Sequence, residues 1–246
     1  MNREEPVPDW LLRSLEWTYP YEIRTYPTQK LSVTALAHRG GILPPEEMPS
    51  FLEQRTGMTS AERGTALHTF LEHMDYVPFR ELPREKWDTE IQRQIAGMRD
   101  GGILGGEEAD SIRVRQISRY LDSPLGRKAA QSRELFREIP FNLAITEKDD
   151  GTFELVRPES SNMVLLQGVI DLYFLGEEDG REGWILVDYK TDRYEVSEEE
   201  VIANHAQQVD WYRKALEILT GIPVLRESVF LFHIGKEIIL PFPTRS

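Results

Sequence analysis

Two strand-like segments give the clearest hydrophobic pattern along the chain. Residues 167–175 and 184–190 are rich in β-branched and aromatic side chains, and the stretch between them is polar and contains three glycines. Two apolar runs around a short Gly-rich polar segment are typical of a β-hairpin. We therefore expect two antiparallel strands joined by a turn whose midpoint falls between Asp179 and Gly180.

Capping signals and helical spacing predict two helices. Thr59 and Glu62 have the spacing of a capping box, which opens a helix. Four apolar residues follow at the i, i+3, i+4 and i+7 positions of one helix face: Leu67, Phe70, Leu71 and Met74. Ser197 and Glu200 form a second capping box, and the helix that it opens is expected to end near Gly221.

The remaining elements are predicted from apolar runs and turn residues. Residues 88–132 indicate two or three helices separated by pairs of glycines, and residues 31–36 predict a short strand or the start of a helix. Further strands are expected at about 137–145, 228–233 and 237–240. The order is therefore helix, three strands, helix and strand, which is an α/β arrangement. The sequence has no internal repeat and no P-loop, so it cannot hydrolyse ATP by the Walker route.

Length and composition bound the class of protein. A chain of 246 residues buries a full core. We expect an N-terminal extension, 1–55, that packs on the domain or on a partner, and a domain, 56–246, with a helical insertion at 88–132. No apolar run approaches the roughly 20 residues that span a bilayer, and the N-terminus has no signal-peptide pattern. The absence of cysteine excludes disulfides, a Cys-ligated zinc and an iron–sulfur cluster, and fits a reducing cytoplasm.

The formal charge of −13 argues against tight, non-specific binding to DNA by this chain alone, because phosphate binding favours a basic surface. The charge does not argue against binding of DNA that a partner protein delivers. Between Arg113 and Arg137 seven residues are basic, and only Asp122 and Glu134 are acidic. This stretch fits a solvated helix face as well as it fits a binding surface.

The predicted hairpin carries the candidate chemistry. A register centred on its turn places Asp171 opposite Asp188, with Cβ atoms roughly 4.5–5.5 Å apart, where like charges are destabilising. Lys190 lies two residues beyond Asp188 and so points to the same sheet face. Two facing acids are stabilised by a divalent cation, and a lysine beside them could position or deprotonate a water molecule. The alternative is a purely structural hairpin in which Lys190 forms a salt bridge with both acids.

Other candidate residues come from the helices and from the first strand. His68 lies one helical turn after Gly64 and is a potential metal ligand or a plain core histidine. Gln208 and Tyr212 share one face of the second capped helix. The pair could serve packing, with a hydrogen bond between the two side chains, or it could serve function. Glu138 could add a carboxylate from the neighbouring strand.

Five short motifs follow one another in an order that resembles RecB-type nucleases of the PD-(D/E)XK superfamily: Gly64-Thr65-Ala66-Leu67-His68, Arg137-Glu138-Ile139-Pro140-Phe141, Gln167-Gly168-Val169-Ile170-Asp171, Asp188-Tyr189-Lys190-Thr191-Asp192, and Gln208 with Tyr212. The sequence looks most similar to the C-terminal nuclease domains of AddA subunits in bacterial AddAB helicase–nucleases. There, Glu16–Tyr21 and Lys30–Thr34 also have counterparts, so the resemblance covers almost the whole chain.

This resemblance implies a restriction-endonuclease-like core with a central mixed β-sheet flanked by helices. It implies Mg²⁺ or Mn²⁺ held by His68, Asp171, Asp188 and the backbone carbonyl of Tyr189. Lys190 would be catalytic, and Gln208 and Tyr212 would lie near the substrate. Glu72 occupies a position that is not expected to be acidic throughout the family, so we leave it out of the site.

The resemblance also implies a context. The substrate would be single-stranded DNA ends, with the 3′-terminated strand trimmed during repair of double-strand breaks. ATP would act only in a helicase region of a longer polypeptide, which is absent here, and the partner would be an AddB-type protein in the bacterial cytoplasm, close to the nucleoid. Two other functions stay open: a catalytically silent module that docks a helicase, and a free-standing endonuclease of the same superfamily.

Overall fold

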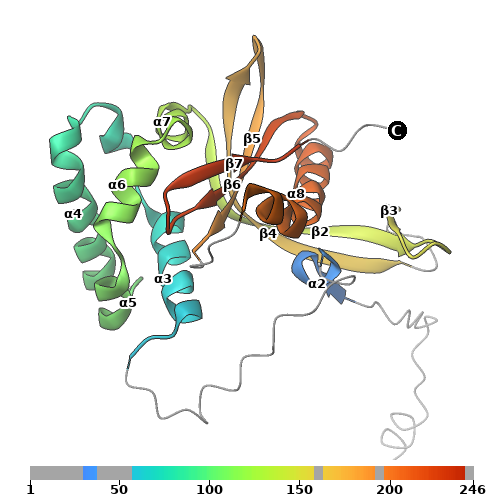
Figure 1. The fold of residues 1–246 in the computed structure, drawn as a ribbon, viewed down its shortest axis with the longest axis horizontal. Coiled ribbons are helices and arrows are strands. Elements are labelled where there is room, and N and C mark those ends of the chain that lie inside the picture. The colour runs from blue at the N-terminus through green and yellow to red at the C-terminus, as the bar shows by residue number, and fades with distance from the viewer. Residues whose placement is uncertain (1–29, 38–56, 158–162, 192–196, 242–246) are drawn as a thin grey trace, which may run out of the picture.

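The computed structural model describes residues 30–37, 57–157, 163–191 and 197–241. Its centre is a mixed seven-stranded sheet with the order β3-β2-β4-β5-β6-β7, in which β1 lies beside β4 (Figure 1). The strands are β1 (Lys30–Ser32), β2 (Leu135–Glu147), β3 (Phe153–Leu155), β4 (Val164–Glu178), β5 (Arg181–Lys190), β6 (Val224–Leu231) and β7 (Lys236–Ile239). The α-helices are α2 (Val33–Ala37), α3 (Ser60–His73), α4 (Trp87–Asp100), α5 (Gly106–Ser111), α6 (Val114–Asp122), α7 (Pro124–Gln131) and α8 (Glu198–Thr220). Two 3₁₀ turns, η2 (Val77–Arg80) and η3 (Arg84–Lys86), connect α3 to α4.

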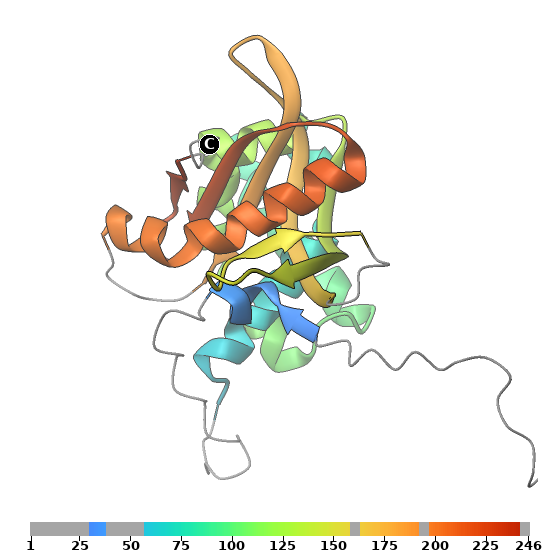
Figure 2. The same ribbon diagram turned by 90° about the vertical axis from the view of Figure 1, so that its right-hand side faces the viewer.

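Helices cover both faces of the sheet (Figures 1 and 2). Each face has its own apolar core. On one face, α3 to α7 pack against Leu172, Phe174 and Val187. On the other face, α8 and α2 pack against a set that includes Leu186 and Val229. Two cores on either side of one mixed sheet confirm the predicted α/β class and the flanked central sheet.

The predicted hairpin is present, and its strands are longer than expected. β4 and β5 pair from Leu172 with Val187 to Glu178 with Arg181, so the expected polar loop belongs mostly to the strands. The turn itself is only Asp179-Gly180, with φ of 51° and 72°. Positive φ at both central residues is the geometry that a two-residue hairpin turn requires, and Asp-Gly suits it. The turn midpoint lies where the sequence predicted it.

The two capped helices are confirmed. Thr59 and Glu62 form the reciprocal capping box before α3, and Ser197 and Glu200 form the one before α8. Helix α8 stops at Gly221, whose φ of 70° is a left-handed conformation that glycine adopts without a steric penalty. These boundaries were predictable because capping is a local interaction.

The helical segment differs from the prediction, because it contains four α-helices rather than two or three. Helices α5, α6 and α7 have only 6, 9 and 8 residues, too few to show a helical period clearly. Their boundaries fall at Ile112-Arg113 and at Ser123, where no glycine pair marks the break. The short strand β3, which pairs with the end of β2, was also missed.

The division into an extension and a nuclease domain stays a prediction. Most of residues 1–55, including the aromatic segment around Trp10 and Trp17, lies outside the described residues. The described part of the extension continues the sheet, since β1 pairs in parallel with β4 at Leu165 to Gln167. Within the described ranges, none of the helices is both long and apolar enough to cross a membrane.

Candidate active site

The candidate site lies where the sheet divides. β1 pairs with β4 up to Gln167, and β5 pairs with β4 from Leu172 onward. The edge of β4 between these two partners faces a cleft of about 690 Å³. Gly168 is required here, because a Cβ atom at this position would come within 2.6–2.7 Å of the Phe141 ring. The topology of the sheet therefore creates an open space beside residues 168–171.

Three neighbouring strands each place one acid at the same level of the sheet, and two of these acids line the cleft. The β4–β5 register, extended by one residue, sets Asp171 opposite Asp188. The β2–β4 register pairs Arg137 with Leu172 and Ile139 with Ile170, so Glu138 lies opposite Asp171. The exposed side-chain fractions are 2% for Asp188, 12% for Asp171 and 22% for Glu138. The site is thus a cross-strand row of three carboxylates.

Glu138 has an unusual backbone conformation within its strand. Its φ is +48°, and it interrupts the ladder between β2 and β4. A non-glycine residue with this conformation costs on the order of 1–3 kcal/mol and persists only where its surroundings fix it. The fixing contact is with helix α3, where Oε1 of Glu138 lies 3.1 Å from Nδ1 of His68.

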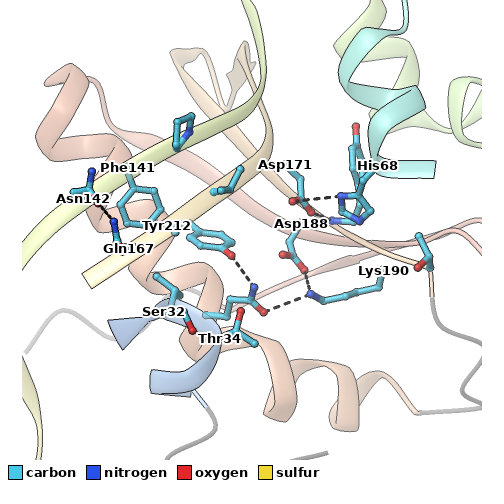
Figure 3. Close-up of a pocket in the computed structure, with 17 residues that line it drawn as sticks. Ser32, Thr34, His68, Phe141, Asn142, Gln167, Asp171, Asp188, Lys190 and Tyr212 are labelled. Carbon is cyan, nitrogen blue, oxygen red and sulfur yellow. Dashed lines mark hydrogen bonds and ion pairs between the residues drawn. The ribbon is translucent and has the colours of Figure 1, made fainter. Parts of the chain in front are cut away.

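His68 connects helix α3 to the row of acids. Its Nδ1 atom is 3.7 Å from Oδ1 of Asp171, and its ring packs edge-on against Tyr189 with centroids 6.1 Å apart. Burial lowers the pKa of His68, but the hydrogen bond with Glu138 and the charge of Asp171 outweigh burial and raise the pKa above 6.5. Figure 3 shows His68 beside Asp171 in the cleft.

Asp171 is the most perturbed acid of the row. Burial and the negative charge of Asp188 raise its pKa from 3.8 to about 7. Two contacts act in the opposite direction: the charge of His68, and a backbone hydrogen bond of 2.7 Å from the Tyr189 N–H to Oδ2. A carboxylate that is buried next to a second carboxylate gains strongly from a nearby cation.

Asp188 faces Lys190 rather than His68. Its Oδ2 atom lies 2.9 Å from Nζ of Lys190, and within the described ranges no donor forms a well-directed hydrogen bond to this oxygen. Nζ is also 3.4 Å from Oε1 of Gln208, whose Nε2 donates to the Tyr212 hydroxyl at 2.7 Å. Figure 3 shows the ion pair between Asp188 and Lys190 as a dashed line. Helix α8 therefore fixes the position of the lysine.

A sequence profile of the PD-(D/E)XK nuclease superfamily matches residues 36–237, which is most of the chain. The chain belongs to the PD-(D/E)XK nuclease superfamily. The acids and the lysine on adjacent strands described above lie within the matched range.

Known relatives point to one branch of the superfamily. The chain is 34% identical over 255 positions to an ATP-dependent helicase/nuclease subunit of Acetivibrio thermocellus, covering 96% of this chain and 19% of that protein. It is 31% identical to the protein of the same name from Syntrophomonas wolfei, covering 93% of this chain and 18% of that protein. The chain therefore spans about a fifth of the length of these relatives.

PD-(D/E)XK nucleases use divalent metals, and the donor set of this chain fits one. One donor atom each from His68, Glu138 and Asp171 lies within 4.8 Å of the others. Oxygen donors suit Mg²⁺ and Mn²⁺, and an imidazole donor favours a transition metal such as Mn²⁺. Asp188, which pairs with Lys190 at 2.9 Å, offers further carboxylate oxygens in the same cleft.

The cleft thus contains His68, Asp171, Asp188, Tyr189, Lys190, Gln208 and Tyr212, which are all predicted site residues. Glu138, considered only as an addition, contacts His68 directly. Glu72 is exposed and lies beside His73, away from the cleft.

Sequence reasoning gave no site role to four residues of the cleft wall, although Gln167 opens one of the motifs and Ser32 and Thr34 lie in the segment Lys30–Thr34. Asn142 and Gln167 are hydrogen-bonded to each other at 2.7 Å, and Ser32 and Thr34 come from β1 and α2. No spacing rule places Ser32 and Thr34 at the cleft, because β1 reaches the cleft only through parallel pairing with β4, more than a hundred residues later in the sequence.

Proposed function

We propose that this chain is a metal-dependent DNA nuclease domain that trims the 3′-terminated strand as part of a longer helicase–nuclease. The observation that carries the proposal is the cross-strand row of Glu138, Asp171 and Asp188, of which Asp171 and Asp188 line an open cleft with Lys190 beside them. A purely structural row of three acids would be destabilising. A cation and a phosphodiester in the cleft give the row a chemical purpose.

In this proposal His68, Asp171, Asp188 and the backbone carbonyl of Tyr189 hold Mg²⁺ or Mn²⁺, with Glu138 as an additional ligand or as the partner that orients His68. The contact between Glu138 and His68 supports the second role, because ligating histidines are usually oriented by a carboxylate. When bound, the cation would lower the pKa of a water molecule and offset negative charge on the phosphate.

Lys190 acts on the reacting phosphate or on the attacking water. Its ammonium group is oriented by Asp188 and Gln208 and opens onto the cleft, with 22% of the side chain exposed. A lysine in this position neutralises the charge that develops on the phosphate oxygens and can accept or return a proton at Nζ. Gln208 and Tyr212 position Lys190 and form the wall against which the strand lies.

The wider role follows from the relatives, which are named as ATP-dependent helicase/nuclease subunits. ATP would be used in a helicase region of the same polypeptide. An AddB-type partner would complete the enzyme, which would process single-stranded DNA ends at double-strand breaks in the bacterial cytoplasm, near the nucleoid. The charge of −13 supports delivery of the strand by these other parts rather than capture by this domain alone.

The test is a cleavage assay on single-stranded DNA that carries a label at its 5′ end or at its 3′ end. The assay is run in Mg²⁺, in Mn²⁺ and in EDTA. We expect cleavage with either metal and none in EDTA, and the first labelled product identifies the end at which the enzyme starts. An intact strand under all three conditions would favour the silent docking module instead.

A further inference from the structure

The basic stretch between Arg113 and Arg137 is divided by the structure into engaged and available side chains. Four of its members are engaged. Three form ion pairs with acids: Arg127 with Asp122, Lys128 with Glu178, and Arg133 with Glu182. The fourth, Arg137, donates to the Met74 carbonyl oxygen. Among the described residues, no carboxylate lies within 4.0 Å of Arg113, Arg115 or Arg119. Of these three, Arg113 lines a hollow in the surface.

This hollow has a volume of about 60 Å³ and lies between the start of α3 and the α5–α6 connection. Its second cation is Arg63, whose guanidinium group donates to the Met58 carbonyl oxygen at 2.6 Å and to Ser60 Oγ at 3.3 Å and, in the described part of the chain, has no carboxylate within 4.0 Å. Two acids near in sequence, Glu62 and Glu108, cap α3 and α5. Hydrogen-bonding groups complete the lining: Ser60, Ser111 and Gln116. Two exposed guanidinium groups with hydroxyl and amide neighbours form an anion site in an acidic protein.

The hollow adjoins the candidate active site. Thr191 lines both the hollow and the cleft, and it directly follows Lys190 at the end of β5. At this point Gly64 packs so closely that a Cβ atom would come within 2.8 Å of Thr191 Oγ1. Arg63 lies five residues before His68 on the same helix, which is about 7.5 Å along the axis. The two sites are therefore close enough for neighbouring parts of one strand to reach both.

We propose that Arg63 and Arg113 form a second phosphate-binding site that holds the backbone of the nucleic-acid strand beside the scissile phosphate, on the α3 side of the cleft. The ligand is a phosphodiester of single-stranded DNA, and the hydroxyl and amide groups of the hollow add hydrogen bonds to its oxygens. This inference rests on the proposed nuclease function and adds how the strand is aligned. An acidic domain that receives its strand from a partner needs such a local anchor to align it with the metal.

Strand binding is measured without cleavage, by fluorescence anisotropy of a labelled 20-nucleotide strand in EDTA. The test protein is the double variant Arg63→Gln/Arg113→Gln. The control is Arg99→Gln/Arg115→Gln, which removes the same charge from exposed arginines that line neither hollow. We expect about a tenfold weaker Kd for the test variant, a change within about threefold for the control, and a salt-dependence slope smaller by about 1.4 for the test variant alone. Thermal unfolding verifies that both variants are folded.

Other outcomes are decisive as well. Equal weakening in the two double variants would mean general charge attraction, and the proposal would be wrong. If inorganic phosphate raises the melting temperature of the parent but not of the test variant, while both bind the strand equally, the hollow holds a free anion and not a strand. A parent that binds through Arg63 and Arg113 but cleaves nothing refutes the nuclease function and keeps the site. If the parent cleaves the strand and the test and control variants bind it equally well, the nuclease function stands and the second phosphate site is refuted.

Discussion

Two regions of this domain each contain a buried acid whose pKa is raised to about 7. They differ in the charged residues around that acid and in whether it lines an open cleft. Asp171 lies in the cleft, where burial and the neighbouring Asp188 raise its pKa. Glu227 on β6, whose side chain is 1% exposed, has a raised pKa because of burial, with Asp210 and Glu217 adding to the effect. A perturbed pKa alone would mark both as functional.

The surroundings separate the two regions. Glu227 lies 2.8 Å from Nε of Arg213, and the same guanidinium group also contacts Asp210 and Glu217. That cluster is tied internally by one arginine. Asp171 has no arginine or lysine partner among the described residues, since Lys190 pairs with Asp188; its cationic neighbour is His68 at 3.7 Å, and it lines an open cleft. Unbalanced acids beside open space, rather than a shifted pKa, indicate the reactive site.

The largest expected effect is on the closed cluster. Arg213→Ala leaves Glu227 buried without its cation, and breaking a buried pair in this way costs about 3–5 kcal/mol. The free energy of unfolding, measured by urea denaturation, should fall by at least about 3 kcal/mol. Arg93→Ala, which removes an exposed pair with Glu90, should cost less than about 1 kcal/mol. Similar losses in the two variants would mean that the Arg213 cluster is not structural.

The next effect concerns catalysis at the open site. Lys190→Ala should slow cleavage of single-stranded DNA at least about a hundredfold and leave strand affinity nearly unchanged, because the lost interaction belongs mainly to the transition state. Lys190→Arg should restore only part of the rate, since a guanidinium group cannot take a proton.

The matched control is Lys214→Ala, which removes a lysine that pairs with Asp210 at 2.8 Å on the far side of α8. Its cleavage rate should stay within a few-fold of the parent. If Lys190→Ala also cleaved within a few-fold, Lys190 would be a structural counter-charge, like Arg213.

Metal binding should also distinguish the two regions, through a smaller change in the free energy of unfolding. At a metal concentration ten times Kd, binding to the folded state alone stabilises by about 1.4 kcal/mol. For a domain of this size the melting temperature should rise by roughly 3–6 °C. Asp171→Asn and Asp188→Asn should abolish this rise, and Glu227→Gln should retain it. A rise that persists in both Asn variants would place the cation elsewhere.

A further effect is on the pH dependence of stability without metal. Folding raises the pKa of Asp171 from 3.8 to about 7, so the folded state keeps a proton that the unfolded state releases. Stability should therefore fall as pH rises from about 4 to 7. Glu227, raised from 4.5 to about 7, contributes in the same direction.

Asp171→Asn and Glu227→Gln should each flatten this pH profile, as measured by thermal unfolding across the window. Added Mn²⁺ should cancel the effect of Asp171, because the metal binds the ionised carboxylate, and should leave that of Glu227 unchanged. An identical response of both acids to Mn²⁺ would remove the distinction between an open and a closed cluster.

Local interactions made much of this domain predictable from its sequence. The two capping boxes, the Gly221 helix end and the Asp179-Gly180 turn each depend on residues a few positions apart, and the structure has them all. The turn fixed the register of β4 and β5, and with it the opposition of Asp171 and Asp188. The number of helices between α4 and α7 was not predictable, because such short helices are stabilised by packing and not by their own period.

The sequence by itself determined which residues could take part in chemistry: two acids at equal distances from a turn, a lysine on the same face, and a histidine on a capped helix. Only the tertiary structure decided which of these residues contact each other. His68 contacts Asp171 and Glu138, whereas Lys190 contacts Asp188 and Gln208. It also decided that β1 and β5 leave an open edge on β4, and that Arg63 and Arg113 lie together beside it. The physical reason is that these contacts join residues far apart along the chain, whose proximity depends on sheet order and strand direction and not on any local pattern.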